Sequence, residues 1–470
     1  MSEQLKFVES QKGKKMLLYQ HYRYRFDYDL ATNGGKSWRC VNCNTGCKGR
    51  ITTLGDSVLS ANTSHNHAEE PAENEAYEIR SCIRERAAET LEPPRQIIQR
   101  CENHATQEVT SFLPSYKASQ RTIERIRQRI NAPYPVPTIL SEIVIPDSLR
   151  YTSTDDDFLL HDSGPSDPER YIMFGTRQNL TELGLAEHWF LDGTFSIVLT
   201  LFEQVYTIHA IKNNKNIPLV YILLTRKHQG LYTRVFERLF ELNDQLNPDS
   251  IMLDFELAAI NAISSVFPHA SIKGCYFHFS QCIYKHIKGT PADALYKNND
   301  DARVLLKCLL SMAFVPESDV IEVFGELQDC YDKFPDLIPV ITFFEENFIG
   351  RVYRHRRLAP RFAISLWNMN ERTLYKLPRT NNAVEGWHRA FQTSVGASHS
   401  SIYNLIEKLH LEQASSERVL TRIMAVETFA LFSKNKYKKI NERIETILED
   451  YDYRLKIDFL KGLAFNLTFN

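Results

Sequence analysis

Three acidic residues occur in contexts that favour a shared metal site. Asp192 closes the apolar run at 189–192, Asp254 closes the run at 251–254, and Glu385 lies in the segment NNAVEGWH. Three carboxylates at one point repel each other and attract hard divalent cations such as Mg2+, which leave room for phosphate oxygens. Two such ions about 3.5–4 Å apart hold the attacking and the leaving oxygen of an in-line displacement. The pattern therefore favours phosphodiester chemistry.

Each of these segments has a plainer interpretation by itself. An Asp after a strand is common, Asp-Gly usually marks a turn, and a helical Glu is often a structural acid. Three neighbours are candidate accessory residues. Cys275 and His278 follow a strand, and they either orient DNA, brace the site, or are an ordinary buried Cys and hydrogen-bonded His. His388 lies one helical turn after Glu385. It either contacts the scissile phosphate or packs beside Trp387.

A second group of residues predicts a structural zinc site. Cys40, Cys43 and Cys47 are followed by His65 and His67, and two thiolates with two imidazoles make a closed tetrahedral set. Spacing alone leaves the second thiolate open between Cys43 and Cys47. Unmetallated cysteines and surface histidines are the alternative. The chain has nine cysteines and no secretory signal at its start, which favours metal ligands over disulfides and a reducing compartment.

The elements that position these residues indicate an α+β multidomain chain. Apolar and polar residues alternate through 1–67, and the expected small antiparallel sheet needs a metal at this size. Later apolar runs and periodic segments give the order βββαβαβ. The expected divisions are a zinc finger at 1–67, an acidic linker at 68–76, three short helices within 77–139, the first part of an α/β core at 140–295, a helical insertion at 296–376, a helix closing the core at 377–415, and C-terminal helices at 416–470.

Because the net charge of the chain is only −2, any contact with DNA has to rest on local clusters of basic residues. Candidates for DNA contact are Arg121, Arg125, Arg127 and Arg129 in the last predicted helix, and Arg354, Arg356 and Arg357 in the insertion. No acidic residue occurs in 351–362, and residues 1–67 hold ten Lys/Arg against five Asp/Glu. These clusters fit phosphate contacts. The helical segment resembles a helix-turn-helix, with a solvated spacer as the alternative.

The motifs together resemble two known families. Phe7, Leu17 or Leu18, Tyr24, Trp38, Cys40, Cys47, His65 and His67 are similar to the FLYWCH zinc finger, and the DGTF, LDFE and TNNAVEGWH segments are similar to the Mutator-like (MULE) transposase domain from about 188 to 415. The first resemblance favours Cys47 over Cys43 as the second thiolate ligand. The second implies an RNase H-like core in which Asp192, Asp254 and Glu385 are catalytic and bind two Mg2+ or Mn2+ ions.

These resemblances imply a nuclear DDE transposase that cuts and joins transposon DNA. Its expected partners are double-stranded DNA, as terminal repeats and target, and further copies of the chain on that DNA. No apolar run approaches the roughly 20 residues of a membrane helix, so no membrane partner is expected. The alternative is a domesticated transposase-derived DNA-binding transcriptional regulator, although such proteins usually lose a catalytic carboxylate. A nuclease of RNA hybrids is disfavoured by the finger and the insertion.

Overall fold

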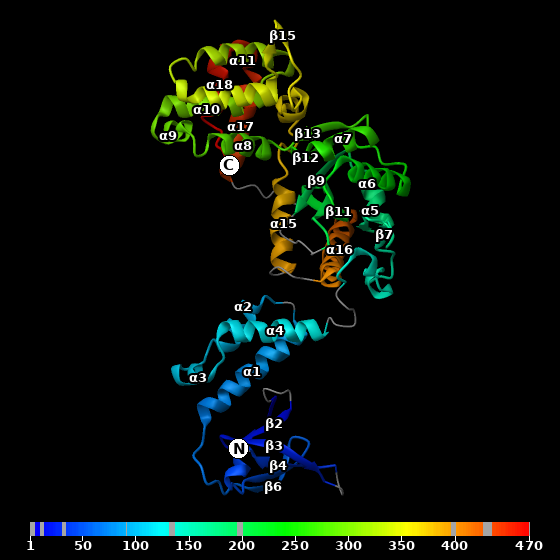
Figure 1. The fold of residues 1–470 in the computed structure, drawn as a ribbon, viewed down its shortest axis with the longest axis vertical. Helices are drawn as coiled ribbons and strands as arrows, with labels where there is room; N and C mark the ends of the chain where they lie inside the picture. The colour runs from blue at the N-terminus through cyan, green and yellow to red at the C-terminus, as the bar shows by residue number, and fades with distance from the viewer. Residues whose placement is uncertain are drawn as a thin grey trace. The chain divides into compact units, whose positions relative to one another are not determined.

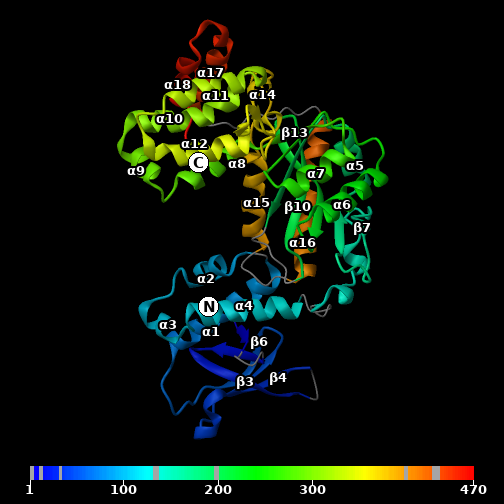
Figure 2. The same ribbon diagram turned by 45° about the horizontal axis from the view of Figure 1, so that its top comes forward.

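The computed structural model describes residues 5–9, 14–30, 34–90, 92–130, 137–194, 201–395, 401–425 and 435–469, without the side chains of 128–130 and 435–437. The chain forms two compact units, residues 1–135 and 136–470 (Figures 1 and 2). A membrane span would need a long apolar helix, and none occurs in the described part of the chain.

The first unit begins with a six-stranded antiparallel sheet whose strands follow one another in sequence order. They are β1 (Lys6–Glu9), β2 (Lys15–Tyr19), β3 (Tyr22–Asp29), β4 (Lys36–Cys40), β5 (Arg50–Leu54) and β6 (Ser57–Asn62). Side chains alternate between the two faces along these strands. One face is therefore buried, and it holds Leu17, Tyr24, Trp38, Ile51, Cys40 and Cys47. Leu18 packs in a separate small cluster, so of the two leucines only Leu17 lies in the core beside the cysteines.

Four helices complete the first unit: α1 (Pro71–Glu89), α2 (Pro94–Glu102), α3 (Gln107–Phe112) and α4 (Tyr116–Ile130). The prediction of three helices was therefore wrong by one. The predicted linker at 68–76 was also wrong from Pro71 onward, because proline suits the first helical position and the following Ala and Glu are good helix formers. Arg23 of β3 makes ion pairs with Glu70 and Glu73, which attach this helix start to the finger.

The second unit is built on a mixed seven-stranded sheet in the order β13-β12-β9-β10-β11-β8-β7. Its strands are β7 (Leu159–Asp162), β8 (Tyr171–Phe174), β9 (His188–Thr194), β10 (Gln204–Lys212), β11 (Lys215–Leu224), β12 (Ser250–Leu253) and β13 (Ser271–Gly274). β9, β10 and β11 are antiparallel neighbours, whereas β12 runs parallel to both β9 and β13. The last strand of the expected order βββαβαβ, predicted at 272–277, is β13 and ends at Gly274.

Helices cover both faces of this sheet (Figure 2). They are α5 (Arg177–Gly184), α6 (Gln229–Leu242), α7 (Leu257–Val266), α15 (Asn382–Val395) and α16 (Ile402–Met424). Phe190 and Met252 pack with Val384 of α15, whereas Trp189 on the other face of β9 packs against Phe267 after α7. Because side chains alternate along a strand, Asp192 shares the α15 face with Phe190.

The remaining helices form one body of the second unit: α8 (Tyr276–Ile287), α9 (Pro291–Asn298), α10 (Asp300–Ser311), α11 (Val320–Asp329), α12 (Ile338–Phe344), α13 (Ile364–Trp367), α14 (Asn370–Leu374), α17 (Asn435–Glu449) and α18 (Lys456–Ala464). α10 and α11 pack on α18, and α14 packs on α17. The C-terminal helices therefore complete the insertion.

Three predicted details of the second unit were wrong. The boundary at 415/416 falls inside α16, and that at 295/296 falls inside α9, because each amphipathic helix continues without a break. The insertion also includes a hairpin of β14 (Val352–Tyr353) and β15 (Arg356–Arg357), of which β15 is labelled in Figure 1. Its two-residue turn is Arg354-His355, which lacks the Asn and Gly that usually signal such turns.

Candidate functional site

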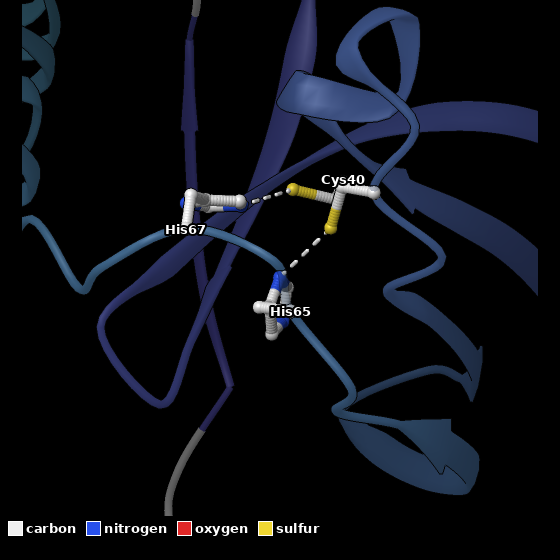
Figure 3. Close-up of side chains that lie close together, drawn as sticks. Cys40, His65 and His67 are labelled. Atoms are coloured by element: carbon white, nitrogen blue, oxygen red, sulfur yellow. Dashed lines mark hydrogen bonds between the residues drawn. The ribbon is translucent and has the colours of Figure 1, made fainter.

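Cys40, Cys47, His65 and His67 form a compact ligand set in the finger. Their ligand atoms all lie within 4.8 Å of one another. The Cys40 sulfur lies 3.2 Å from His67 Nε2 (Figure 3). The Cys47 sulfur lies 3.3 Å from His65 Nδ1. Ligands of a tetrahedral zinc would be about 3.5 Å apart at ordinary Zn–S and Zn–N bond lengths. The cluster therefore fits a structural Zn2+.

The second nitrogen of each imidazole is held by a neighbouring group. His65 Nε2 contacts the Tyr24 hydroxyl at 2.8 Å, and His67 Nδ1 contacts the Ala68 carbonyl at 3.0 Å. Contacts of this kind fix the tautomer and leave the opposite nitrogen's lone pair for the metal. The ring of Tyr22 also stacks on His65, with 3.6 Å between ring centroids.

The zinc ligand set of the finger does not include Cys43, and the position of the His65 ring requires a glycine at residue 49. Cys43 lies in the 3-10 helix η1 (Val41–Thr45), where its sulfur contacts Arg25 Nη2 at 2.8 Å, and it is outside the four-ligand cluster. A Cβ on Gly49 would lie 2.4 Å from Cε1 of His65, so a larger residue at this position could not coexist with the observed ring. Burial raises the pKa of the Cys40 thiol to about 11.

Asp192 and Asp254 lie at adjacent positions of the second sheet. Asp192 is in β9 and is 9% exposed, and Asp254 directly follows the neighbouring strand β12. Asp192 Oδ1 accepts a hydrogen bond from the Gly193 N–H at 2.9 Å, and Asp254 Oδ1 accepts one from the Glu256 N–H at 3.3 Å. Gly193 continues β9, so the Asp-Gly pair is not a turn here.

Glu385 reaches this region from the first turn of α15. The segment before the helix is tied to the sheet and to α8, because the Asn381 side chain donates to the Leu191 carbonyl at 2.9 Å and the Asn381 N–H donates to the Cys275 sulfur at 3.2 Å. In addition, the Tyr276 N–H donates to the Arg379 carbonyl at 2.9 Å. These bonds fix where the helix begins and thus where Glu385 lies.

Electrostatic effects connect the three carboxylates. Burial raises the pKa of Asp254, and the negative charge of Asp192 raises it further. Burial also raises the pKa of Glu385, where the His278 charge acts in the opposite direction and Asp192 again raises it. The three carboxylates are not among the groups of described residues whose ligand atoms all lie within 4.8 Å of one another.

The accessory candidates lie beside these acids. Cys275, His278 and Glu385 form the second group of potential ligands within 4.8 Å of one another, and His278 Nε2 is 3.7 Å from Glu385 Oε1. Cys275 is fully buried and receives the Asn381 N–H, which favours bracing of the site over contact with DNA. His388 is also buried, and its Nδ1 lies 3.2 Å from Asp192 Oδ2.

Sequence reasoning missed three polar residues at this site. Thr207 and His209 face the interior from β10, and their signal was a pair of polar residues at alternate positions within an apolar run. Glu256 follows Asp254 by two residues and accepts a hydrogen bond from the Tyr232 hydroxyl at 3.0 Å. A cavity of about 470 Å3 opens beside these acids and is lined by Asp254, Phe255, Glu256, His278, Gln281, Cys282, Lys285 and His286.

The basic candidates divide into two classes. Arg127 donates to the carbonyls of Thr90 and Glu92 at 2.9 and 2.7 Å, close to the end of α1, and Arg357 pairs with Glu345 at 3.1 Å. The guanidinium groups of Arg127 and Arg357 therefore contact other residues of the protein. In contrast, Arg121, Arg125, Arg354 and Arg356 are exposed and make no ion pair with any residue that the structure describes. The side chain of Arg129 lies outside the described residues.

Comparisons with known proteins agree with this organisation. Residues 7–67 match the family model of the FLYWCH zinc finger domain, and residues 188–282 match that of the MULE transposase domain. The chain therefore carries a FLYWCH zinc finger domain and a MULE transposase domain, as the two resemblances predicted, although the MULE match ends at residue 282 rather than near 415. The MULE match includes Asp192 and Asp254 and ends before Glu385.

Two further searches add little. No curated protein matches the chain. Among solved structures, the chain is similar to one from the Drosophila P element transposase strand transfer complex, at 11% identity, covering 85% of this chain and 93% of that one. The TM-score is 0.21, which is too low to establish a shared fold.

Proposed function

We propose that this protein is a DDE transposase that cuts and joins transposon DNA, with Asp192, Asp254 and Glu385 as its catalytic carboxylates on an RNase H-like core. The observation that carries the proposal is geometric: Asp192 in β9 and Asp254 after the parallel neighbour β12 lie at adjacent positions of the sheet, and α15, which carries Glu385, packs on β9. The strand order β11-β10-β9-β12-β13, with β12 parallel to β9, is the order used by RNase H-like cores.

The residues at this point fit a divalent cation. Glu385 is 13% exposed at its side chain, and its Oε1 is buried without a hydrogen-bond partner among the described residues. Buried carboxylate oxygens that lack partners are costly unless a cation compensates them. Asp192, Asp254 and Glu385 would hold Mg2+ or Mn2+, which when bound activates the nucleophile and stabilises the leaving oxygen.

Neighbouring residues fix the orientation of the acidic side chains, and the cavity beside them leaves space for the DNA. Asn381 and Cys275 fix the start of α15, and the cavity beside Asp254 and His278 leaves space for a phosphate. The proposed reaction is displacement at phosphorus, in which water attacks first and the freed 3′-hydroxyl of DNA attacks a target strand afterwards. The enzyme forms no covalent intermediate.

Recognition of DNA is assigned to surfaces outside this cavity. We propose that the finger binds transposon ends, with Lys117, Arg121 and Arg125 of α4 contacting the backbone. These three exposed residues lie four positions apart and so share one helical face. Arg354 and Arg356 of the β14–β15 hairpin are proposed to contact phosphates as well. A protein with this activity would act in the nucleus, as an assembly of several copies on DNA.

The test is a strand-cleavage assay on the ends of the element that encodes this chain, with and without Mg2+. Cleavage that requires Mg2+ and is lost in Asp192→Asn, Asp254→Asn and Glu385→Gln would support the proposal. End binding by the wild-type chain with no cleavage under any divalent metal would instead favour a DNA-binding regulator.

A further inference from the structure

A buried chain of polar side chains connects β10 to the Asp192 carboxylate. His388 Nδ1 lies 3.2 Å from Asp192 Oδ2, and His388 Nε2 lies 2.9 Å from the Thr207 hydroxyl. The same hydroxyl lies 2.9 Å from His209 Nε2. All of these residues are less than a tenth exposed. Such a network inside the protein is strong only if each member is satisfied.

The sheet register explains why these residues meet. Thr207 of β10 is the direct cross-strand partner of Asp192 in β9, and directly paired residues project from the same face. Thr207 and His209 are two positions apart and so share that face as well. α15 covers it and inserts His388 between Thr207 and Asp192. Trp387, the preceding residue, donates to Glu412 of α16 at 2.8 Å, which fixes the rotation of α15.

The hydrogen positions follow from the chemistry of the partners. An ionised carboxylate only accepts hydrogen bonds, so Nδ1 of His388 carries the proton that it donates to Asp192. The Thr207 hydroxyl both donates and accepts, and it therefore satisfies Nε2 of His388. Asp192 Oδ1 accepts from the Gly193 N–H. Each carboxylate oxygen thus receives one N–H and keeps a further lone pair for another partner.

We propose that His388 is a positioning residue, which together with Thr207 holds the Asp192 carboxylate in the orientation that binds the catalytic metal. This inference rests on the proposed function. It assigns His388 neither to the DNA phosphate nor to simple packing beside Trp387, because both of its ring nitrogens are engaged by protein groups. Partners that orient metal-binding groups commonly change metal affinity by 10–100-fold.

The experiment measures Mn2+ binding to the full-length, zinc-loaded chain by electron paramagnetic resonance. His388→Phe keeps a buried ring without a donor, and we expect it to weaken Mn2+ binding by about tenfold. His388→Asn restores an N–H near the position of Nδ1 and should bind Mn2+ within about threefold of wild type. Thr207→Val removes the hydroxyl and should give an intermediate loss. Melting temperatures of all three variants control for folding.

The outcomes separate this inference from the proposed function. If Asp192→Asn abolishes Mn2+ binding whereas His388→Phe binds like wild type, the metal site stands and the role of His388 is refuted. Equal weakening in His388→Phe and His388→Asn would refute it too, because a purely structural residue would not be rescued by a donor. Unchanged Mn2+ binding in Asp192→Asn would overturn both the metal site and the role of His388.

Discussion

At the scale of single residues, the finger shows how ligand choice is made by geometry. Cys43 and Cys47 are both near Cys40 in sequence, but only Cys47 lies within reach of His65. The Gly46 backbone at the end of η1 has φ of +87°, a conformation that suits glycine, and it turns the chain so that Cys47 returns to the cluster. The ligand set therefore depends on this turn and on the small size of Gly49.

The first prediction tests the ligand assignment. Cys43→Ser should leave one zinc per chain, because the Cys43 sulfur contacts Arg25 and lies outside the cluster. Cys47→Ser should release the zinc, since three remaining ligands do not close a tetrahedral structural site. Metal content of the two purified full-length variants is the measurement. Zinc loss from Cys43→Ser with retention in Cys47→Ser would reverse the assignment.

The second prediction concerns Gly49. Gly49→Ala should lower zinc affinity by about tenfold or more, because the added methyl group would lie 2.4 Å from the His65 ring. Chelator competition on the full chain measures this affinity. Gly55→Ala is the matched control: Gly55 also lies in the finger and has a φ of +55°, but a Cβ there meets no atom within 4 Å. Equal losses in both variants would show that general destabilisation, rather than contact with His65, is responsible.

At the scale of elements, strands were easier to predict than the contacts between them. The runs that became β9 to β12 are apolar and bounded by turns, so their order was evident from sequence. β14 and β15 were not predicted, because Arg354 and His355 adopt positive φ values of 47° and 64° without Asn or Gly. The contacts of Arg127 and Arg357 inside the protein were not predicted either, because their partners, such as the Thr90 carbonyl, are identified only by the tertiary fold.

The β14–β15 hairpin gives the third prediction. Non-glycine residues at positive φ cost about 1–3 kcal/mol each, and this turn keeps two of them at a tip with exposed Arg354, Arg356 and Tyr353. We expect this tip to contact DNA phosphates through Arg354 and Arg356. The double variant Arg354→Ala/Arg356→Ala should weaken DNA binding and lower the slope of log affinity against log salt by about 1.8, as expected for two lost phosphate contacts.

Arg357→Ala is the matched control from the same hairpin. Arg357 pairs with Glu345 and donates to the Gly350 carbonyl, so its loss should lower the free energy of unfolding by about 1–2 kcal/mol and leave the salt slope unchanged. Fluorescence anisotropy at several salt concentrations and a denaturant titration provide the two measurements. An unchanged salt slope in the double variant would exclude the hairpin from the DNA-binding surface.

At the scale of the whole molecule, the division between units lies near residue 135 rather than at the predicted acidic linker. The ion pairs of Arg23 with Glu70 and Glu73 make the finger and α1 parts of one unit. The four zinc ligands belong to this unit, and the three carboxylates belong to the other. Residue type and spacing predicted both groups, but the choice of Cys47 over Cys43 and the catalytic role of the carboxylates came from the family resemblances, and that catalytic role stays a prediction. Sequence alone could not locate the boundary, because helix α1 begins within residues whose composition is that of a linker.

The last prediction follows from this separation. Asp254→Asn nearly preserves side-chain volume but removes a charge that is buried beside Asp192, so the fold should not be weakened, because a buried repulsion is relieved. Binding of DNA ends should persist. Cleavage should fall by more than the 10–100-fold that loss of an outer contact to a metal ligand costs, since a proposed ligand itself is lost.

His65→Ala should do the opposite, because losing zinc unfolds the finger and weakens recognition while the carboxylates remain in place. Gel shifts and Mg2+-dependent cleavage are measured on both full-length variants, with cleavage of His65→Ala assayed at saturating DNA. Full cleavage by Asp254→Asn would refute the mechanism, and loss of both activities in both variants would show that the two units do not function independently.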